Sequence, residues 1–328
     1  MISRETLLQI ARDAAAQRMA ARRSLLSAYL TGSVAAGEPL LGEATDIDLI
    51  LIDAEAPLQE REIVRLSDQV ILDILYRPKH AYANAKTLRT DPWRGPEMCA
   101  PYFLSDPTHF FELAQASVRG QFHRPDYVVG RARACLHLAR EELHLGAVPG
   151  AEPQAPVTLA NFCQALWYAS NACLCLNGFP AGRRRLTLHL AQAQPEMYAA
   201  FSALWSDVPL TAESAQLWLE DWSAAYLAGQ SSDNELIHPA RRSVYARGFQ
   251  AQIQAGRGSD CWWLMLYTWQ ACLKNLAGDS LHADRWTAFL EQLHMGSAAN
   301  FAFRLRQVQQ YVEQAAAVVE RWALANGE

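Results

Sequence analysis

Two aspartates stand out in the sequence because of their spacing. Asp46 and Asp48 begin the segment DIDLILID, which is rich in Ile and Leu and predicts a strand. Because side chains alternate between the two faces of a strand, both carboxylates are predicted to project from the same side. Two carboxylates about 4 Å apart repel each other by roughly 4 kcal/mol at an effective dielectric constant of about 20. A divalent cation would remove this repulsion, and carboxylate oxygens are suitable ligands for Mg²⁺.

A third aspartate, Asp73, interrupts the apolar segment VILDILY. A lone charge in an apolar strand is costly unless it has a partner. If this strand pairs beside the strand of Asp46 and Asp48, all three carboxylates can join one cluster. Two Mg²⁺ ions would then form a clamp for in-line displacement at a phosphoryl group. The predicted metal ligands, and the predicted catalytic residues, are therefore Asp46, Asp48 and Asp73.

The dipeptide Gly32-Ser33 is predicted to bind phosphate. It ends the apolar run SLLSAYLTGS, which reads as a strand that stops at a tight turn. Glycine lets a backbone approach a phosphate closely and present its N–H groups. The Ser33 hydroxyl can add a further donor, and a helix after the turn would add its positive N-terminal end.

In this order and spacing, Gly32-Ser33, Asp46-Ile-Asp48 and Asp73 resemble the polymerase β-like nucleotidyltransferase superfamily. The resemblance implies transfer of a nucleoside monophosphate from an NTP, expected to be ATP, to an acceptor hydroxyl, with release of pyrophosphate. It also implies that Asp46 and Asp48 bind the catalytic metals. Asp73 would complete the cluster or help to deprotonate the acceptor, and Gly32 and Ser33 would hold the triphosphate.

The resemblance covers about a third of the chain and is closest to the small-molecule branch, which includes the aminoglycoside nucleotidyltransferases. Many relatives carry an Arg shortly after Gly-Ser, whereas this chain has Val, Ala and Ala there, so charge compensation of the substrate is unassigned. Members of this branch join the fold to a helical domain that can supply a general base. By the resemblance, Glu141 and Glu142 are the counterparts considered for the acceptor base.

Two other functions are compatible with the sequence. The chain could be a non-catalytic nucleotide-binding or interaction protein of the toxin–antitoxin type, with the same motif but no turnover. Arg184 and His189 also have the spacing of HEPN ribonucleases, which predicts metal-independent RNA cleavage. The run Arg183-Arg184-Arg185 could instead contact a phosphate or an acidic substrate, and a solvated start of a helix explains it more simply.

The pattern of elements predicts an α+β protein with two domains. Residues 1–122 are expected to form the nucleotidyltransferase fold, a small mixed β-sheet with helices, and residues 123–328 an all-α helical bundle that binds the acceptor. Strands are predicted over 24–33, 46–53, 70–76 and 101–105. Helices are predicted over 3–25, 57–68, 107–120 and 126–145, and, after a loop over 146–156, over 158–176, 195–206, 211–228, 239–255, 260–277, 283–294 and 297–325.

Composition limits the remaining possibilities. The 328 residues are 51% hydrophobic and 19% charged, which excludes a generally disordered chain. The net charge of −5 makes broad binding to nucleic acid unexpected and favours a small-molecule acceptor. The uncharged stretch from Pro153 to Gly182 contains several polar residues, so it is expected to be a core helix and not a membrane span. The seven cysteines are expected to be buried thiols, the location is expected to be cytoplasmic, and a homo-oligomer is left open.

Overall fold

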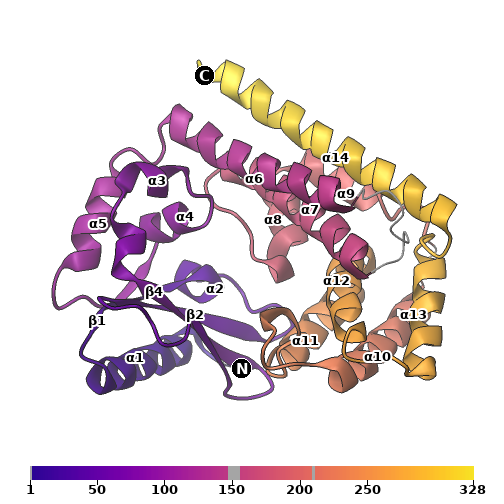
Figure 1. The fold of residues 1–328 in the computed structure, drawn as a ribbon, viewed down its shortest axis with the longest axis horizontal. Helices are drawn as coiled ribbons and strands as arrows, with labels where there is room; N and C mark the ends of the chain where they lie inside the picture. The colour runs from indigo at the N-terminus through magenta and orange to yellow at the C-terminus, as the bar shows by residue number, and fades with distance from the viewer. Residues whose placement is uncertain (1, 147–155, 209–210) are drawn as a thin grey trace. The chain divides into compact units, whose positions relative to one another are not determined.

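The computed structural model describes residues 2–146, 156–208 and 211–328 of the chain (Figure 1). The chain divides into two compact units, Met1–Val128 and Val129–Glu328, whereas the sequence placed the division after residue 122. The first unit contains a five-stranded mixed sheet with helices, and the second is helical. The protein therefore has the α+β organisation.

The first unit is a single sheet with helices on both faces. Its strands lie in the order β3-β4-β2-β1-β5, with β2 parallel to β4 and the other neighbours antiparallel. The segments predicted as strands over 24–33, 46–53, 70–76 and 101–105 all contribute to this sheet. The elements are α1 (Arg4–Ala21), β1 (Leu25–Thr31), α2 (Gly32–Ala36), β2 (Thr45–Asp53), β3 (Arg61–Arg65), β4 (Val70–Pro78), α3 (Ala85–Thr90), α4 (Arg94–Cys99), β5 (Tyr102–Ser105) and α5 (Phe110–Arg119).

The helix predicted over residues 57–68 is wrong, because part of this segment forms β3. This edge strand pairs antiparallel with β4, and its central residue Ile63 lies opposite Asp73. The connection is tight: the Ser67 hydroxyl accepts hydrogen bonds from the backbone N–H groups of Gln69 and Val70, each at 3.1 Å. Pairing with a neighbouring strand decides the structure of such a short segment, and its own helix preference is too weak to oppose it.

Different helices cover the two faces of the sheet. The first core cluster joins α1 to the face of β2 that carries Ile47, Leu49 and Leu51. The second core cluster lies on the opposite face, where Ile50 and Ile52 meet residues of α3, α4 and α5. Figure 1 shows α1 on one side of the strands and α3, α4 and α5 on the other. Every second residue of β2 thus belongs to the same layer.

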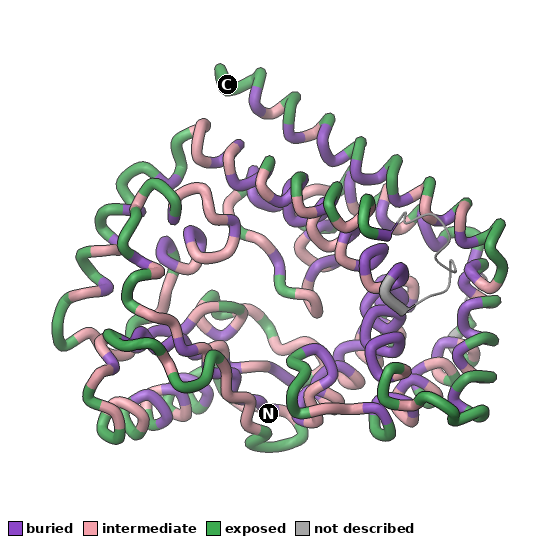
Figure 2. The backbone as a smooth tube through the Cα atoms, in the orientation of Figure 1, coloured by how far each residue is buried: buried purple, intermediate pink, exposed green. Residues whose placement is uncertain are grey.

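The second unit is a helical assembly around α12. This helix is buried along almost its entire length, whereas α14 is buried along one side and exposed along the other (Figure 2). The helices are α6 (Pro125–Gly146), which begins in the first unit, α7 (Pro156–Cys175), α8 (Leu186–Ala193), α9 (Pro195–Ala203), α10 (Ala212–Gly229), α11 (Arg241–Gln254), α12 (Trp262–Leu273), α13 (Ser280–Gln292) and α14 (Ala298–Ala325).

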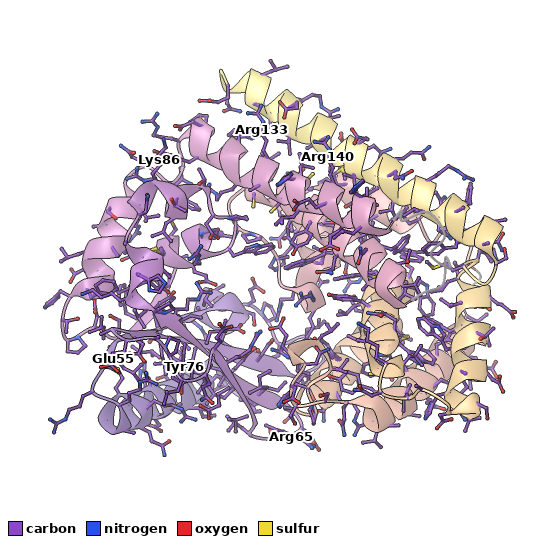
Figure 3. The ribbon with its side chains drawn as sticks, viewed as in Figure 1. Glu55, Arg65, Tyr76, Lys86, Arg133 and Arg140 are labelled. Atoms are coloured by element: carbon purple, nitrogen blue, oxygen red, sulfur yellow. The ribbon has the colours of Figure 1, made fainter. Side chains whose placement is uncertain are left out.

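Ion pairs join α6 to α14 at the surface of this assembly. Arg133 and Arg140, which Figure 3 labels on α6, pair with Glu320 at 2.6 Å and with Glu313 at 3.5 Å. The long helices predicted in this half of the chain are confirmed. The loop predicted over 146–156 falls mostly outside the described residues.

The structure bears on two predictions about apolar segments, the burial of the cysteines and the absence of a membrane-spanning helix. All seven cysteines are free thiols and are buried, as predicted. Among the residues that the structure describes, no helix is long and apolar enough to cross a membrane.

An ion pair between α4 and β4 fixes the helical cover to the sheet. Arg77 and Glu97 approach to 2.6 Å and 2.8 Å at their two pairs of atoms, and their side chains are 16% and 17% exposed. Burial raises the pKa of Glu97, against the lowering effect of the Arg77 charge. Burial also lowers the pKa of Arg77, but Glu97, Tyr29 and Tyr82 together raise it, so this pKa lies above its ordinary value.

The substitution Glu97→Gln should therefore destabilise the first unit. It keeps the shape of the side chain but leaves the Arg77 charge without its counter-charge. This loss should cost about 2–3 kcal/mol, which is less than for a fully buried pair because both groups retain some access to water. Urea denaturation measures this loss. Glu112→Gln, which removes an exposed carboxylate paired with His109, is the control and should change the free energy of unfolding by less than about 0.5 kcal/mol. Equal stability of the two variants would contradict the structural role of the pair.

Candidate active site

Two carboxylates lie on the same face of β2 near the start of the strand. Asp46 and Asp48 are partly exposed, whereas Ile47 and Leu49 between and beyond them are buried against α1. Two residues along a strand span about 7 Å, so one small ligand can meet both side chains. The alternation of burial therefore places a pair of accessible carboxylates at one end of the sheet.

The turn after β1 lies against one of these carboxylates. Thr31, the last residue of β1, is opposite Asp48 in the antiparallel register. Gly32 follows with a φ of 70°, in the left-handed region that favours glycine, and a Cβ atom at this position would collide with Asp48 Oδ2. Both the backbone conformation and the available space therefore require glycine at this position.

The serine of the turn faces the beginning of β2. Ser33 Oγ is 3.4 Å from Thr45 Oγ1, and Thr45 directly precedes Asp46. Gly32, Ser33 and the two carboxylates therefore belong to one small region, in which the sequence placed a phosphate-binding turn and a metal site.

An arginine of α1 holds the far end of the turn. The Arg4 guanidinium donates to the backbone carbonyl of Val34 at 3.1 Å and to that of Ala35 at 2.8 Å, near the end of α2. Because carbonyl groups at the end of a helix lack partners within the helix, these bonds stabilise the short α2. The turn is thus fixed by β1 at one end and by α1 at the other.

The third aspartate is next to Asp48 but has a different partner. Asp48 and Asp73 are in register on the parallel strands β2 and β4. The Asp73 side chain is 1% exposed, and both of its oxygens accept hydrogen bonds from Arg61 of β3, each at 2.7 Å. The lone charge in the apolar strand therefore has the partner that its burial requires, and that partner is a guanidinium.

The donor set fits a cation at Asp46 and Asp48 better than a cluster of three ligands. Two partly exposed carboxylates beside a bare glycine backbone suit a hard cation and the phosphate oxygens that accompany it. Within the described ranges, no group of three or more His, Cys, Asp or Glu side chains is arranged to hold a metal ion. The structure thus brings Asp46, Asp48, Gly32 and Ser33 together, while Asp73 is engaged by Arg61.

The two glutamates considered for the acceptor base lie on α6 in different environments. Glu141 is exposed and pairs with His137 at 3.3 Å. Glu142 is partly buried, and burial, together with the charge of Glu141, raises its pKa above the ordinary value. Burial thus distinguishes Glu142 from its exposed neighbour on the same helix.

Arg183 lies against aromatic side chains of the second unit, and both Glu142 and Arg183 influence the pKa of two tyrosines there. Burial raises the pKa of Tyr267 to about 12, and the charge of Glu142 adds to this effect while Arg183 opposes it. Tyr168 responds in the same way. The Arg183 guanidinium lies 4.7 Å from the ring centre of Trp167 and 5.7 Å from that of Tyr267. Arg183, which the sequence reads as a solvated helix start, is thus a packed residue.

Sequence reasoning missed Arg61, because it assigned residues 57–68 to a helix. The β-branched pair Ile63-Val64 was the available signal, since such residues favour strands, although polar and apolar residues do not alternate in this segment. This signal predicts a strand but does not identify its partner. Only the register with β4 shows that Arg61 can reach Asp73.

A scan against models of known protein families finds no match, and a search of curated proteins finds none either. A functional assignment therefore rests on the side chains and backbone that the structure brings together. The carboxylates of β2 and the turn at Gly32 are the most informative of these.

A pair of glycine substitutions tests the close approach of the turn to Asp48. Gly32 and Gly37 have nearly the same φ, 70° and 73°, so alanine should be similarly strained at both positions. At Gly37 the nearest atoms to a Cβ belong to the Arg4 guanidinium, at 3.3 Å, so a shift of a few tenths of an ångström would suffice. Gly32→Ala should therefore lower the free energy of unfolding by about 1–3 kcal/mol more than Gly37→Ala.

Thermal and urea denaturation of both variants measure this difference. The added variant Gly32→Ala/Asp48→Ala should recover part of it, because it removes the carboxylate with which the new methyl group collides. Equal losses in the two single variants would show that strain alone, and not contact with Asp48, explains the glycine.

Proposed function

We propose that this protein is a divalent-cation-dependent nucleotidyltransferase, which moves a nucleoside monophosphate from an NTP to an acceptor hydroxyl and releases pyrophosphate. The observation that carries the proposal is the placement of Asp46 and Asp48 on one face of β2, with Asp48 directly against the Gly32 turn. The mixed five-stranded sheet that holds them is compatible with a nucleotidyltransferase fold, which we propose for the first unit.

The carboxylates and the turn are suited to different parts of one polyphosphate. A Mg²⁺ ion held by Asp46 and Asp48 would offset negative charge on the phosphates and favour the departure of pyrophosphate. The backbone N–H groups of Gly32 and Ser33 can approach phosphate oxygens because Gly32 carries no side chain. Since both groups are fixed by the sheet and by α2, they can orient the α-phosphate for attack from the opposite side.

Glu142 is the proposed acceptor of the proton from the attacking hydroxyl. A carboxylate with a raised pKa is a better general base near neutral pH than an ordinary one, and Glu142 has this property through its burial. Glu141 is exposed and is engaged by His137. Of the two glutamates to which the family resemblance points, Glu142 therefore has the environment that the role requires.

A small molecule is the proposed acceptor, and ATP the proposed NTP. The net charge of −5 supports a small acceptor over a nucleic acid, because a polyanion gains affinity mainly from clustered Lys and Arg. We propose no role for a membrane.

Substitution of either β2 carboxylate should abolish nucleotidyl transfer while leaving the protein folded. Asp46→Asn and Asp48→Asn each remove a proposed metal ligand, and the lost charge stabilisation of several kcal/mol predicts a rate at least about a hundredfold lower. Release of pyrophosphate from ATP with Mg²⁺, over a panel of small hydroxylated acceptors, measures this rate. Asp68→Asn is the control, since Asp68 is an exposed carboxylate in the β3–β4 turn that pairs with Arg65.

Three results would contradict the proposal in different ways. Full turnover in Asp46→Asn would exclude this residue as a metal ligand. Binding of Mg²⁺-ATP without pyrophosphate release by the unaltered protein would favour the non-catalytic binding or interaction protein. Metal-independent RNA cleavage that is lost in His189→Ala would favour the ribonuclease.

The two adjacent glutamates of α6 provide a matched test of the proton acceptor. The raised pKa means that Glu142 deprotonates at a higher pH than an ordinary carboxyl group, so transfer should rise with pH through that range and level off above it. Glu142→Gln should remove this acidic limb and lower the rate by about 10²-fold or more, whereas Glu141→Gln should change it by less than about threefold. Identical pH–rate profiles for the two variants would exclude Glu142.

A further inference from the structure

The short helix α2, which carries Ser33 of the proposed phosphate-binding turn, depends on contacts at its ends. It has five residues, and an isolated helix of this length is not stable in water. The N–H of Gly37 donates to the backbone carbonyls of Ser33 and Val34. The N–H of Glu38 donates to the Ser33 carbonyl at 2.9 Å. These bonds close the helix locally, but they do not tie it to the rest of the first unit.

A guanidinium from the start of α1 makes that connection. Arg4 Nε donates to the Val34 carbonyl at 3.1 Å, and Arg4 Nη2 donates to the Ala35 carbonyl at 2.8 Å. One planar group thus bonds to two consecutive carbonyls at the C-terminal end of α2, where carbonyls lack partners within the helix and positive charge is favoured. Gly37 leaves room for this contact, because a Cβ atom there would lie 3.3 Å from Arg4 Cζ.

Arg4 is itself held in place by α1 and β5. It is the first residue of α1, whose N-cap Ser3 accepts a hydrogen bond from the Thr6 N–H at 3.1 Å. The Arg4 guanidinium lies 5.9 Å from the ring centre of Tyr102 in β5, and Arg12 donates to the Tyr102 hydroxyl at 2.8 Å. Elements that the fold has already placed therefore hold the guanidinium against α2 before a ligand arrives.

The cation ligands proposed on β2 do not rely on this contact. Asp46 and Asp48 belong to a strand that pairs with β1 on one side and with β4 on the other, so the sheet fixes their backbone. The backbone of the Gly32 turn is fixed by β1 at one end and by α2 at the other. Loss of the Arg4 contact should therefore loosen the turn and leave the two carboxylates in place.

We propose that Arg4 is a positioning residue for the nucleotide, which holds α2 so that the N–H groups of Gly32 and Ser33 stay directed toward the phosphates. This inference rests on the proposed function and adds a residue to the binding machinery of that site. Arg4 acts through the turn and not by touching the nucleotide, since it contacts the end of α2 away from Gly32. Its removal weakens the binding of a triphosphate but not that of a divalent cation, because fixed donors bind more tightly than mobile ones.

Separate titrations with a non-hydrolysable ATP analogue in excess Mg²⁺ and with Mn²⁺ alone test this split. Calorimetry measures the first dissociation constant, and electron paramagnetic resonance measures the second. Arg4→Met keeps the apolar stem but removes the charge and both donors. It should raise the dissociation constant of the analogue about tenfold, while that of Mn²⁺ stays within about twofold. Arg4→Lys keeps the charge but has one donor atom in place of two, so the analogue should bind about threefold more weakly.

Arg18→Met is the matched control. Arg18 is another arginine of α1 that ties this helix to the sheet, through an ion pair with Glu62 of β3 at 2.5 Å. Its loss removes a structural contact of the same kind without touching α2. Both dissociation constants should stay within about twofold of those of the unaltered protein.

An unchanged dissociation constant of the analogue in Arg4→Met would overturn the inference while leaving the proposed function in place. Equal weakening of the analogue and of Mn²⁺, or equal weakening of the analogue in Arg18→Met, would also overturn it, because either result indicates general damage to the first unit. No binding of the analogue or of Mn²⁺ by the unaltered protein would overturn the inference and the proposed function together. If Arg4→Met fails to fold, as judged by circular dichroism, Arg4→Lys decides the question, and an unchanged affinity for the analogue would overturn the inference.

Discussion

The close approach of like charges on neighbouring strands is the constraint on which the first unit depends. Asp48 and Asp73 lie in register on β2 and β4, on the sheet face to which Ile50 and Ile52 contribute apolar side chains. Such a pair is stable only if positive charge stands next to it. Arg61 supplies that charge from β3, so the edge strand has an electrostatic role in addition to completing the sheet. The pairing of β3 with β4 therefore explains how the Asp73 carboxylate can be buried.

The sequence predicts most of the sheet but not its charge balance. Segments such as DIDLILID and VILDILY are rich in Ile and Leu and bounded by turn residues, so β2 and β4 could be located without coordinates. Arg61–Arg65 could not, because a short polar segment becomes a strand only when a partner is available. Since Arg61 and Asp73 are brought together by that pairing, the sequence showed that Asp73 needs a partner and left open which one.

Similar limits apply to the second unit. Long helices with apolar periodicity were predictable, because burial of one face repeats along the chain. The difference between Glu141 and Glu142 was not, since both occur in one acidic pair on α6 and only the packing of the helix decides which of them loses water. The same holds for Arg183, whose guanidinium lies over Trp167. In a sequence, a run of three arginines suggests a solvated surface. Only the structure shows that an aromatic ring lies beneath one of them.

The arrangement of one sheet face shows why chemistry is expected at only one of its ends. Arg77 and Glu97 occupy the far end, where α4 covers them and where their charges neutralise each other. An apolar band that includes Ile50 lies between this pair and Asp46 and Asp48. Arg77 and Glu97 are covered and neutralise each other, whereas Asp46 and Asp48 keep contact with solvent. An arrangement built only for stability would not need accessible acidic groups packed against a glycine turn, and this asymmetry is the reason to assign the near end to a ligand.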